Sequence, residues 1–301
     1  MSMDNFIFIN DVGPRDGLQN QAVQVEVADR VELINKLLDA GLPGVEVASF
    51  VNPKAVPRMA GAGEIVAALK GKAAELSALV PNMKGYEMAR DAGTQIISVV
   101  PSATETMNRK NINMGYEDIM SLSCEIMQQA KADNMRGQAY VSVAFSCPFE
   151  GPVSHERVIE MALRLRDAGA AEIIIADTIG AANPAQVKTL FTKLAGEIDV
   201  AVMSAHFHDT RAMGLVNAYA AIECGFRKFD ASIGGLGGCP FAPGAAGNLA
   251  TEDLVGMVHQ MGFETGIDER KLMAAADYAG ELIQAPIGGR MAGWLAGELA
   301  S

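Results

Sequence analysis

The feature that most restricts the fold of this chain is a regular alternation of short apolar runs with longer amphipathic stretches. Eight apolar runs have the length and composition of β-strands. They cover Phe6–Asp11, Gly44–Ser49, Leu76–Val80, Ile96–Pro101, Gln138–Phe145, Glu172–Ala176, Val200–His206 and Lys228–Ile233. The stretches between them predict helices over Ala28–Ala40, Glu64–Ala68, Gly85–Ala92, Tyr116–Asn134, His155–Ala168, Pro184–Glu197 and Met213–Cys224.

The joints between these elements also repeat. The phrase Asp-Ala-Gly closes three of the helical stretches, beginning at Asp39, Asp91 and Asp167, and glycine directly after a helix is a common terminator. Eight βα units favour a (β/α)8 TIM barrel. An open doubly wound sheet is the alternative, but no Gly-x-Gly-x-x-Gly motif follows a predicted strand.

The end of the chain predicts additional C-terminal helices. Helical patterns cover Leu249–Gln260, Glu269–Gln284 and Gly289–Ala300. We therefore expect a single domain over residues 1–301, with the barrel over about residues 5–260 and a helical segment over about residues 261–301.

Composition and charge exclude several classes of partner. The net charge of −12 argues against binding to nucleic acid or to an anionic membrane surface. The four cysteines show no Cys-x-x-Cys spacing, the first residues lack a basic region, and no apolar run is long enough to cross a bilayer. We expect a soluble, cytoplasmic protein with reduced thiols.

Two of the four histidines stand close together at the end of the seventh predicted strand. Alternate residues of a strand share a face, so His206 and His208 point the same way, into the barrel. Such a pair can bind one metal ion, or it can be a pair of satisfied polar residues at a strand end.

Other polar residues cluster where catalytic groups of barrel enzymes lie, at the carboxyl ends of strands. Arg15 and Asp16 follow the first strand, Glu46 points inward from the second and Asp177 ends the sixth. Simpler interpretations are a solvent ion pair for Arg15 and Asp16, a structural ion pair for Glu46, and a helix N-cap for Asp177. The glycine-rich loop after the eighth strand carries an exposed Cys239 and ends at Asn248.

Asp16, His206, His208 and Asn248 together offer a mixed set of oxygen and nitrogen ligands. Four ligands leave two positions of an octahedron open, which indicates a catalytic metal site. Oxygen-rich ligation of this kind suits Mg²⁺ or Mn²⁺ better than structural zinc.

Five motifs resemble 3-hydroxy-3-methylglutaryl-CoA lyase and the related barrel metallolyases with Arg-Asp-Gly and His-x-His motifs. They are Val12-Gly-Pro-Arg-Asp-Gly-Leu-Gln-Asn20, Arg109-Lys-Asn-Ile-Asn113, Asp177-Thr-Ile-Gly180, His206-Phe-His-Asp-Thr210 and Gly235-Leu-Gly-Gly-Cys-Pro-Phe-Ala242. The resemblance covers nearly the whole chain, and the glycine-cysteine loop separates the lyases from the related Claisen-type synthases.

The resemblance implies retro-Claisen cleavage of 3-hydroxy-3-methylglutaryl-CoA to acetoacetate and acetyl-CoA, with a divalent metal on the four ligands. It implies that Arg15 stabilises the thioester enolate and that Cys239 lies near the enolate carbon. It also places Glu46, Asp177 and His206 among the catalytic residues, without deciding which group is the base. A homodimer is the implied assembly.

Four further residues are candidates for binding the substrate. Gln19 lies in a matched motif, and Arg109 and Lys110, in the expected loop after the fourth strand, are candidates for the phosphates of CoA. Arg211 departs from the family pattern, where the histidines are followed by Asp-Thr-Tyr-Gly-Gln. It could bind a carboxylate or lie on the surface. The alternatives are a lyase for citramalyl-CoA or an isohexenyl homologue, a condensing synthase, and a non-enzymatic metal-binding barrel.

Overall fold

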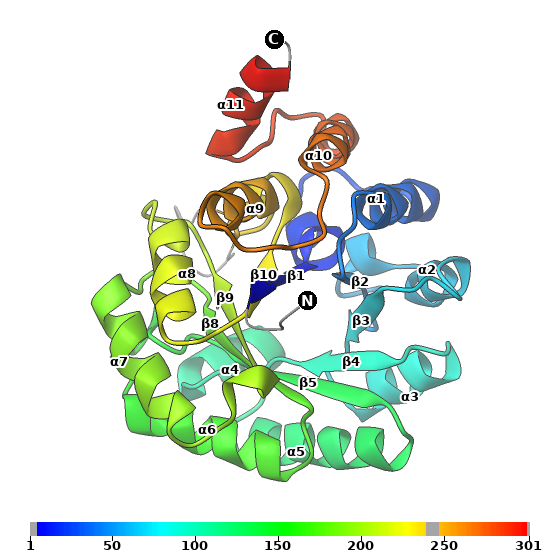
Figure 1. Ribbon diagram of the computed structural model, residues 1–301. Helices are drawn as coiled ribbons and strands as arrows, with labels where there is room; N and C mark the ends of the chain where they lie inside the picture. The colour runs from blue at the N-terminus through cyan, green and yellow to red at the C-terminus, as the bar shows by residue number, and fades with distance from the viewer. Residues whose placement is uncertain (1–4, 239–246, 300–301) are drawn as a thin grey trace.

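Eight parallel strands close into a barrel in the computed structural model, which describes residues 5–238 and 247–299 (Figure 1). The order around the barrel is β1-β10-β9-β8-β5-β4-β3-β2, so strands that follow each other along the chain pair with each other and β10 pairs with β1. The strands are β1 (Phe8–Asp11), β2 (Gly44–Ser49), β3 (Glu75–Leu79), β4 (Ile96–Val99), β5 (Arg136–Val141), β8 (Glu172–Asp177), β9 (Met203–Phe207) and β10 (Lys228–Ala231). The predicted TIM barrel is confirmed.

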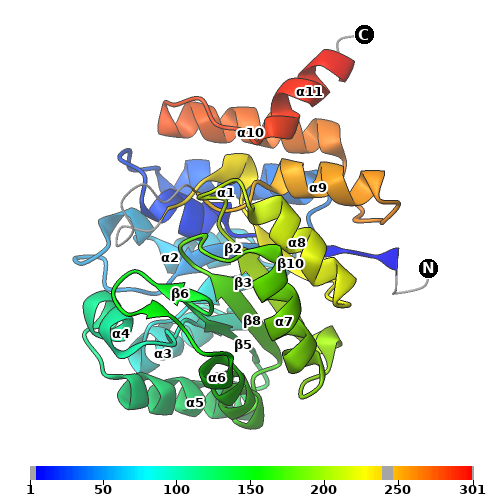
Figure 2. The same cartoon turned by 90° about the vertical axis from the view of Figure 1, so that its left-hand side faces the viewer.

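Helices surround the barrel and cover its outer surface (Figure 1). They are α1 (Val27–Asp39), α2 (Ala62–Ala68), α3 (Met83–Asp91), α5 (Tyr116–Ala132), α6 (His155–Asp167), α7 (Pro184–Ala195), α8 (Gly214–Glu223) and α9 (Thr251–Gln260). The helix α4 (Glu105–Ile112) packs against α5 at one end of the barrel (Figure 2). The main core lies between strands and helices, where the stacked rings of Phe191 and Phe226 are 4.3 Å apart. A smaller cluster of Tyr140, Ile174 and Ala176 forms a separate buried group on β5 and β8.

The three glycines predicted to terminate helices do so, and Gly225 ends a fourth helix in the same way. Gly41, Gly93, Gly169 and Gly225 follow α1, α3, α6 and α8 and have φ values of +94°, +87°, +105° and +92°. A side chain disfavours this left-handed backbone, so glycine lets the chain leave the helix sharply and return to the barrel.

Five of the predicted strands are shorter in the structure than the sequence suggests, and two of them have a clear local cause. The expected strand Val200–His206 begins at Met203, because residues 200–202 form a 3₁₀ turn. The Asp199 carboxylate accepts a hydrogen bond from the Ala201 N–H at 3.0 Å, and this local bond competes with strand pairing. The expected strand Gln138–Phe145 ends at Val141, since Val143 has a φ of +51° that a β-strand does not allow.

The prediction of a loop after β4 is also wrong. The expected loop that carries Arg109 and Lys110 is the helix α4, which ends at Asn113 in a left-handed conformation (φ +55°). Few of its side chains are buried, so apolar periodicity does not reveal it. A short antiparallel hairpin of β6 (Ser146–Cys147) and β7 (Gly151–Pro152) lies between β5 and α6.

Two further helices, α10 (Glu269–Ile283) and α11 (Arg290–Leu299), lie outside the ring, next to α1 and α9 (Figure 2). The Asp253 carboxylate on α9 accepts hydrogen bonds from the N–H groups of Arg290 and Met291 at 3.0 and 2.7 Å. It thereby fixes the first turn of α11. Among the described residues, no helix is both long and apolar enough to cross a membrane.

Candidate active site

The first turn after β1 carries two charged side chains at the barrel mouth. Gly13–Gly17 forms a single π-helical turn, in which the N–H of Gly17 donates to the carbonyl of Val12 at 3.2 Å. Such turns are rare and are frequent at functional sites. The turn brings Arg15 and Asp16 together, with 2.9 Å between Nη1 of Arg15 and Oδ1 of Asp16.

Glu46 on β2 fixes the other side of Arg15. Its Oε2 accepts a hydrogen bond from Nε of Arg15 at 2.6 Å, and its Oε1 accepts one from the Ser98 hydroxyl on β4 at 2.9 Å. Burial alone would lower the pKa of Arg15, but the carboxylates of Glu46 and Asp16 raise it above its ordinary value. The guanidinium is therefore a permanent cation held in one orientation.

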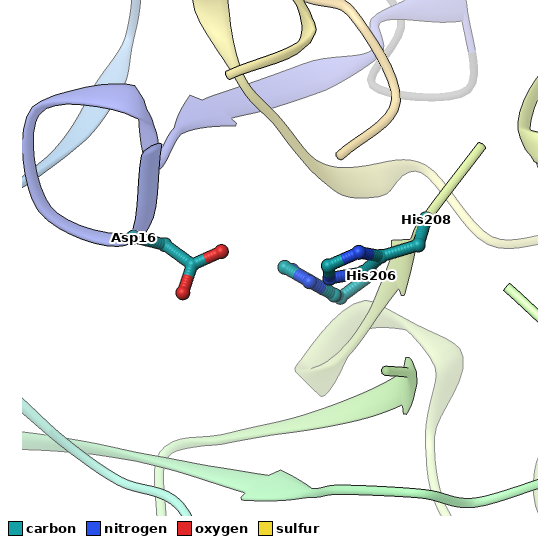
Figure 3. A group of neighbouring side chains, drawn as sticks. All are labelled: Asp16, His206 and His208. Carbon is teal, nitrogen blue, oxygen red and sulfur yellow. The ribbon is translucent and has the colours of Figure 1, made fainter. Parts of the chain in front are cut away.

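The two histidines meet Asp16 across the barrel mouth. One ligand atom from each of Asp16, His206 and His208 lies within 4.8 Å of the others, and both imidazoles are buried. Figure 3 shows the Asp16 carboxylate pointing from its turn toward the imidazoles on and just after β9. A divalent cation binds such ligands at roughly 2.0–2.2 Å, so one ion between them could reach all three.

Asn248 adds a fourth group beside this cluster. Its Nδ2 donates to Oδ2 of Asp16 at 2.7 Å and to the carbonyl of Leu236 at 2.9 Å, while its buried Oδ1 has no hydrogen-bond partner among the described residues. A buried acceptor without a partner is costly, so an oxygen left open here fits a bound cation. Gly237 permits this approach, because a Cβ there would collide with Nδ2 of Asn248.

A carboxylate behind His206 was not identified from the sequence. Oδ2 of Asp230 on β10 lies 3.1 Å from Nδ1 of His206, and it accepts a hydrogen bond from the Tyr140 hydroxyl at 2.6 Å. A carboxylate on Nδ1 leaves Nε2 of the imidazole as the ligand atom, an arrangement common behind metal-bound histidines. The sequence signal for this carboxylate is that Asp230 is an acidic residue within the otherwise mostly apolar eighth predicted strand.

Neighbouring charges shift the pKa values of Asp16 and His206. Burial alone would raise the pKa of Asp16, but Arg15, His206 and His208 hold it below its ordinary value. Burial alone would lower the pKa of His206, but Asp230 and Asp16 raise it. A metal ion would have to displace a proton to bind the ring nitrogen of His206, so metal binding at this candidate site would weaken at low pH.

A cavity of about 450 Å³ opens beside the cluster. Arg15, Asp16, His206 and His208 line one part of it, and Gln19 also contributes to its wall. The structure thus brings the candidate metal ligands, the fixed cation and a substrate-sized cavity into one place.

Asp177 and Arg211 hold the loop between β8 and α7 and are not among the residues that line this cavity. The Asp177 carboxylate accepts hydrogen bonds from the N–H groups of Ala181 and Ala182 at 2.8 and 3.0 Å, and burial raises its pKa to about 6. Nε and Nη2 of Arg211 donate to the carbonyls of Gly180 and Ala182 at 3.0 and 2.9 Å. Their catalytic and substrate-binding roles stay predictions.

Arg109 and Lys110 lie apart from the ligand cluster. Arg109 forms an ion pair with Glu105 at 2.5 Å and lines a second, more polar cavity of about 640 Å³ between α4, α5 and the β6–β7 hairpin. Nζ of Lys110 lies 5.0 Å from the centre of the Phe149 ring. Cys239, the predicted residue near the enolate carbon, lies outside the described residues.

Known proteins are similar to this chain over most of its length. The family model described as HMGL-like matches residues 6–278. The hydroxymethylglutaryl-CoA lyase YngG of Bacillus subtilis is 41% identical over 94% of this chain and 95% of its own length. The (R)-citramalyl-CoA lyase of Chloroflexus aurantiacus is 42% identical over 93% of this chain and 92% of its own length.

A solved structure adds a fold comparison. An HMG-CoA lyase from Acinetobacter baumannii, in complex with coenzyme A and 3-methylmalate, superposes with a TM-score of 0.93 at 36% identity, over 97% of this chain and 96% of that chain. The matched region contains every strand of the barrel and the whole candidate ligand set. The chain belongs to the HMGL-like family and is a carbon–carbon lyase.

Proposed function

We propose that this protein cleaves 3-hydroxy-3-methylglutaryl-CoA to acetoacetate and acetyl-CoA with the help of a divalent cation. The observation that supports this proposal best is the orphaned Oδ1 of Asn248 beside the cluster of Asp16, His206 and His208. These four residues would hold the ion, and Mg²⁺ and Mn²⁺ both suit their ligand atoms. When bound, the ion would lower the pKa of the substrate's C3 hydroxyl and so favour its deprotonation.

Arg15 would supply the fixed positive charge that the reaction needs. Cleavage of the C2–C3 bond leaves an electron pair on the acetyl-CoA fragment as a thioester enolate, while the C3 hydroxyl oxygen becomes the ketone of acetoacetate. The Arg15 guanidinium lines the cavity and is already oriented by Glu46 and Asp16, so it can stabilise the enolate without reorganising. The enolate carbon then takes a proton to give acetyl-CoA, and Cys239 is the proposed source.

The acyl group of the substrate is a separate question within the proposal. The (R)-citramalyl-CoA lyase is as similar to this chain as YngG is, which makes citramalyl-CoA the second candidate substrate. A panel of 3-hydroxyacyl-CoA thioesters, assayed for release of acetyl-CoA, decides between them. Cleavage of citramalyl-CoA and not of hydroxymethylglutaryl-CoA would contradict the first candidate.

The metal requirement has its own test. We expect a chelator to abolish cleavage, and Mn²⁺ or Mg²⁺ to restore it and to raise the melting temperature of the metal-free protein. The variant Asn248→Ala should bind the ion more weakly. Asn82→Ala is the control and should bind it normally, because Asn82 is the exposed N-cap residue of α3 and lines another part of the cavity wall. Full activity in the presence of chelator would remove the metal from the proposal.

Arg15 is tested by Arg15→Met, which should lower kcat by about 100-fold or more while metal affinity changes little.

We also infer a homodimer located in the cytoplasm, following the resemblance to the lyases. Light scattering on the purified protein tests the dimer, and a monomeric mass would contradict it. The cytoplasmic location stays a prediction.

A further inference from the structure

Glu252 on α9 is a buried carboxylate that the proposed reaction does not use. It is 1% exposed, and its helix packs against both C-terminal helices, α10 and α11 (Figure 1). Its Oε2 accepts a hydrogen bond from the N–H of Gly234 at 3.0 Å, and its Oε1 accepts one from the N–H of Gly289. A carboxylate that accepts a bond on each oxygen holds its two donors in fixed positions. Glu252 therefore ties the segment after β10 to the start of α11.

Gly234 is held from several sides. It lies in the short turn Ile233–Gly235 after β10, and its carbonyl accepts a hydrogen bond from the N–H of Gly288 at 3.3 Å. Its φ is +63°, and a Cβ at this position would lie 2.5 Å from Cδ1 of Ile287. Both facts favour glycine, which lets the C-terminal segment pack directly against the turn. The turn is therefore supported by residues that follow it by more than 50 positions in the chain.

The other end of this turn meets the candidate metal ligand Asn248. Leu236 directly follows the turn, and its carbonyl accepts a hydrogen bond from Nδ2 of Asn248 at 2.9 Å. Nδ2 also donates to Oδ2 of Asp16 at 2.7 Å. With both hydrogens of the amide used, Oδ1 faces the remaining direction and has no hydrogen-bond partner among the described residues. The position of the Leu236 carbonyl thus helps to decide where Oδ1 points.

The main chain beside Asn248 is fixed without Glu252. The N–H of Leu249 donates to the carbonyl of Phe207 at 2.9 Å, and Asn248 forms a β-bridge with His208. These contacts join the segment to the end of β9. A change at Glu252 should therefore turn the amide of Asn248 and leave its backbone in place.

We propose that Glu252 is a positioning residue for Asn248. It acts through the turn after β10: its Oε2 fixes the N–H of Gly234, and the turn then presents the carbonyl of Leu236 to the amide. This role rests on the proposed metal-dependent function, because it concerns how the chain prepares a ligand for the ion. Changing a residue that directly contacts a metal ligand weakens metal binding by roughly 10- to 100-fold. Glu252 lies further away, so we expect a smaller effect.

The test is a double-mutant cycle on Mn²⁺ affinity, measured by calorimetric titration of the metal-free protein. Glu252→Gln keeps the size of the side chain but replaces one acceptor oxygen by an NH₂ group, which cannot accept from a backbone N–H. We expect it to weaken Mn²⁺ binding by about fivefold to tenfold. In the Asn248→Ala background, which lacks the amide, the same change should alter the affinity by less than about twofold. A general loss of structure would instead weaken binding in both backgrounds.

Asp253→Asn is the matched control. Asp253 is the next residue of α9, is also buried, and accepts its hydrogen bonds from the N–H groups of Arg290 and Met291 rather than from the turn after β10. Its substitution removes one carboxylate from the same helix and disturbs the same C-terminal segment, so Mn²⁺ affinity should stay within about twofold. Equal weakening in Asp253→Asn and Glu252→Gln would assign the effect to charge or to α11 packing, and it would overturn the proposal.

Glu252→Asp is a second variant that keeps the test decisive if Glu252→Gln folds poorly. It retains both acceptor oxygens but withdraws them by one methylene, so we expect the same dependence on Asn248 with a smaller loss of Mn²⁺ affinity. Activity gives a second readout. The Mn²⁺ concentration for half-maximal cleavage should rise, while KM for the acyl-CoA substrate stays within about twofold. A higher KM at unchanged Mn²⁺ affinity would place Glu252 in substrate binding and overturn the proposal.

The remaining outcomes separate this inference from the proposed function. Normal Mn²⁺ affinity in a folded Glu252→Gln protein overturns the positioning role and leaves the lyase function intact. Equal weakening with and without Asn248 does the same, because Glu252 would then act by another route. If Asn248→Ala binds Mn²⁺ as tightly as the wild type, Asn248 is not a ligand, and the proposed ligand set fails together with this inference. Absence of Mn²⁺ and Mg²⁺ binding by the wild-type protein contradicts the metal-dependent function itself.

Discussion

His206 and Asp230 are paired residues of the neighbouring strands β9 and β10, and their side chains meet with 3.1 Å between Nδ1 and Oδ2. Both are buried, and Asn10 on β1 donates a further hydrogen bond to Oδ1 of Asp230 at 2.9 Å. Three adjacent strands thus orient one imidazole toward Asp16. The orientation of the His206 imidazole therefore depends on neighbouring strands of the closed barrel and not only on the loops at its mouth.

We expect Asp230→Asn to weaken Mn²⁺ binding by about 10- to 100-fold, because a neutral amide oxygen accepts the hydrogen bond from Nδ1 of His206 more weakly than a carboxylate does. Calorimetric titration of the metal-free protein with Mn²⁺ measures this. Tyr140→Phe is the control, since it removes only the hydroxyl that donates to the same carboxylate, and it should change the affinity by less than about threefold. Normal Mn²⁺ affinity in Asp230→Asn would show that this carboxylate does not orient the ligand.

Glu46→Gln should lower the free energy of unfolding by about 3–5 kcal/mol, because it leaves the buried cation of Arg15 without its main partner. Urea denaturation measures the change. Glu75→Gln breaks an ion pair with Arg136 in which both side chains are exposed, and it should cost less than about 1 kcal/mol. Similar losses in the two variants would show that the buried pair of Arg15 and Glu46 stabilises the protein no more than an exposed ion pair does.

Arg211→Lys should lower the free energy of unfolding by about 1–3 kcal/mol, since the single nitrogen of lysine replaces the separate Nε and Nη2 atoms that donate to the carbonyls of Gly180, Ala181 and Ala182. The KM for hydroxymethylglutaryl-CoA should stay within about twofold, as Arg211 is not among the cavity-lining residues. Arg90→Lys, on an exposed pair, controls for the substitution itself. A rise in KM of about tenfold or more, with unchanged stability, would support the substrate contact predicted from the sequence.

Asp11 should make stability depend on pH. Burial raises its pKa from 3.8 to about 7, against the hydrogen bonds that it accepts from Thr251 and Gly13. Between these values the folded protein binds more protons than the unfolded chain, so the contribution of Asp11 is full below about pH 4 and is lost as the pH rises through about 7.

The variant Asp11→Asn removes this titration. The difference in unfolding free energy, wild type minus Asp11→Asn, should fall by about 2–3 kcal/mol from about pH 5 to about pH 8. Urea denaturation at a series of pH values measures both proteins under the same conditions. Parallel profiles for the two proteins would show that Asp11 does not titrate in this range.

The barrel and most of the ligand cluster could be predicted from local sequence. Strands alternate side chains with a period of two, and catalytic groups of barrels gather at the carboxyl ends of the strands. These two rules predict that His206, His208 and Asp16 surround one point, and their ligand atoms do lie within 4.8 Å of one another. The same rules predict that Glu46 points into the barrel, where it meets Arg15.

The predictions that differed depended on side-chain contacts. The 3₁₀ turn before β9 follows from one bond of Asp199, and the loop after β8 is held by Arg211, which lies 29 residues or more along the chain from the carbonyls it contacts. The polar helix α4 buries few side chains and has no clear apolar period. Local propensity carries no information about such partners.

The sequence by itself determined a closed eight-unit barrel and a set of metal-ligating residue types, because both follow from short-range periodicity and position along a strand. Only the tertiary structure decided what orients those ligands. Asp16 and Asn248 are 232 residues apart in the chain, and Tyr140 and Asp230 are 90 residues apart, yet each pair is hydrogen-bonded. Barrel closure brings such residues together at the mouth of the barrel, beside the cavity that Arg15 and the two histidines line.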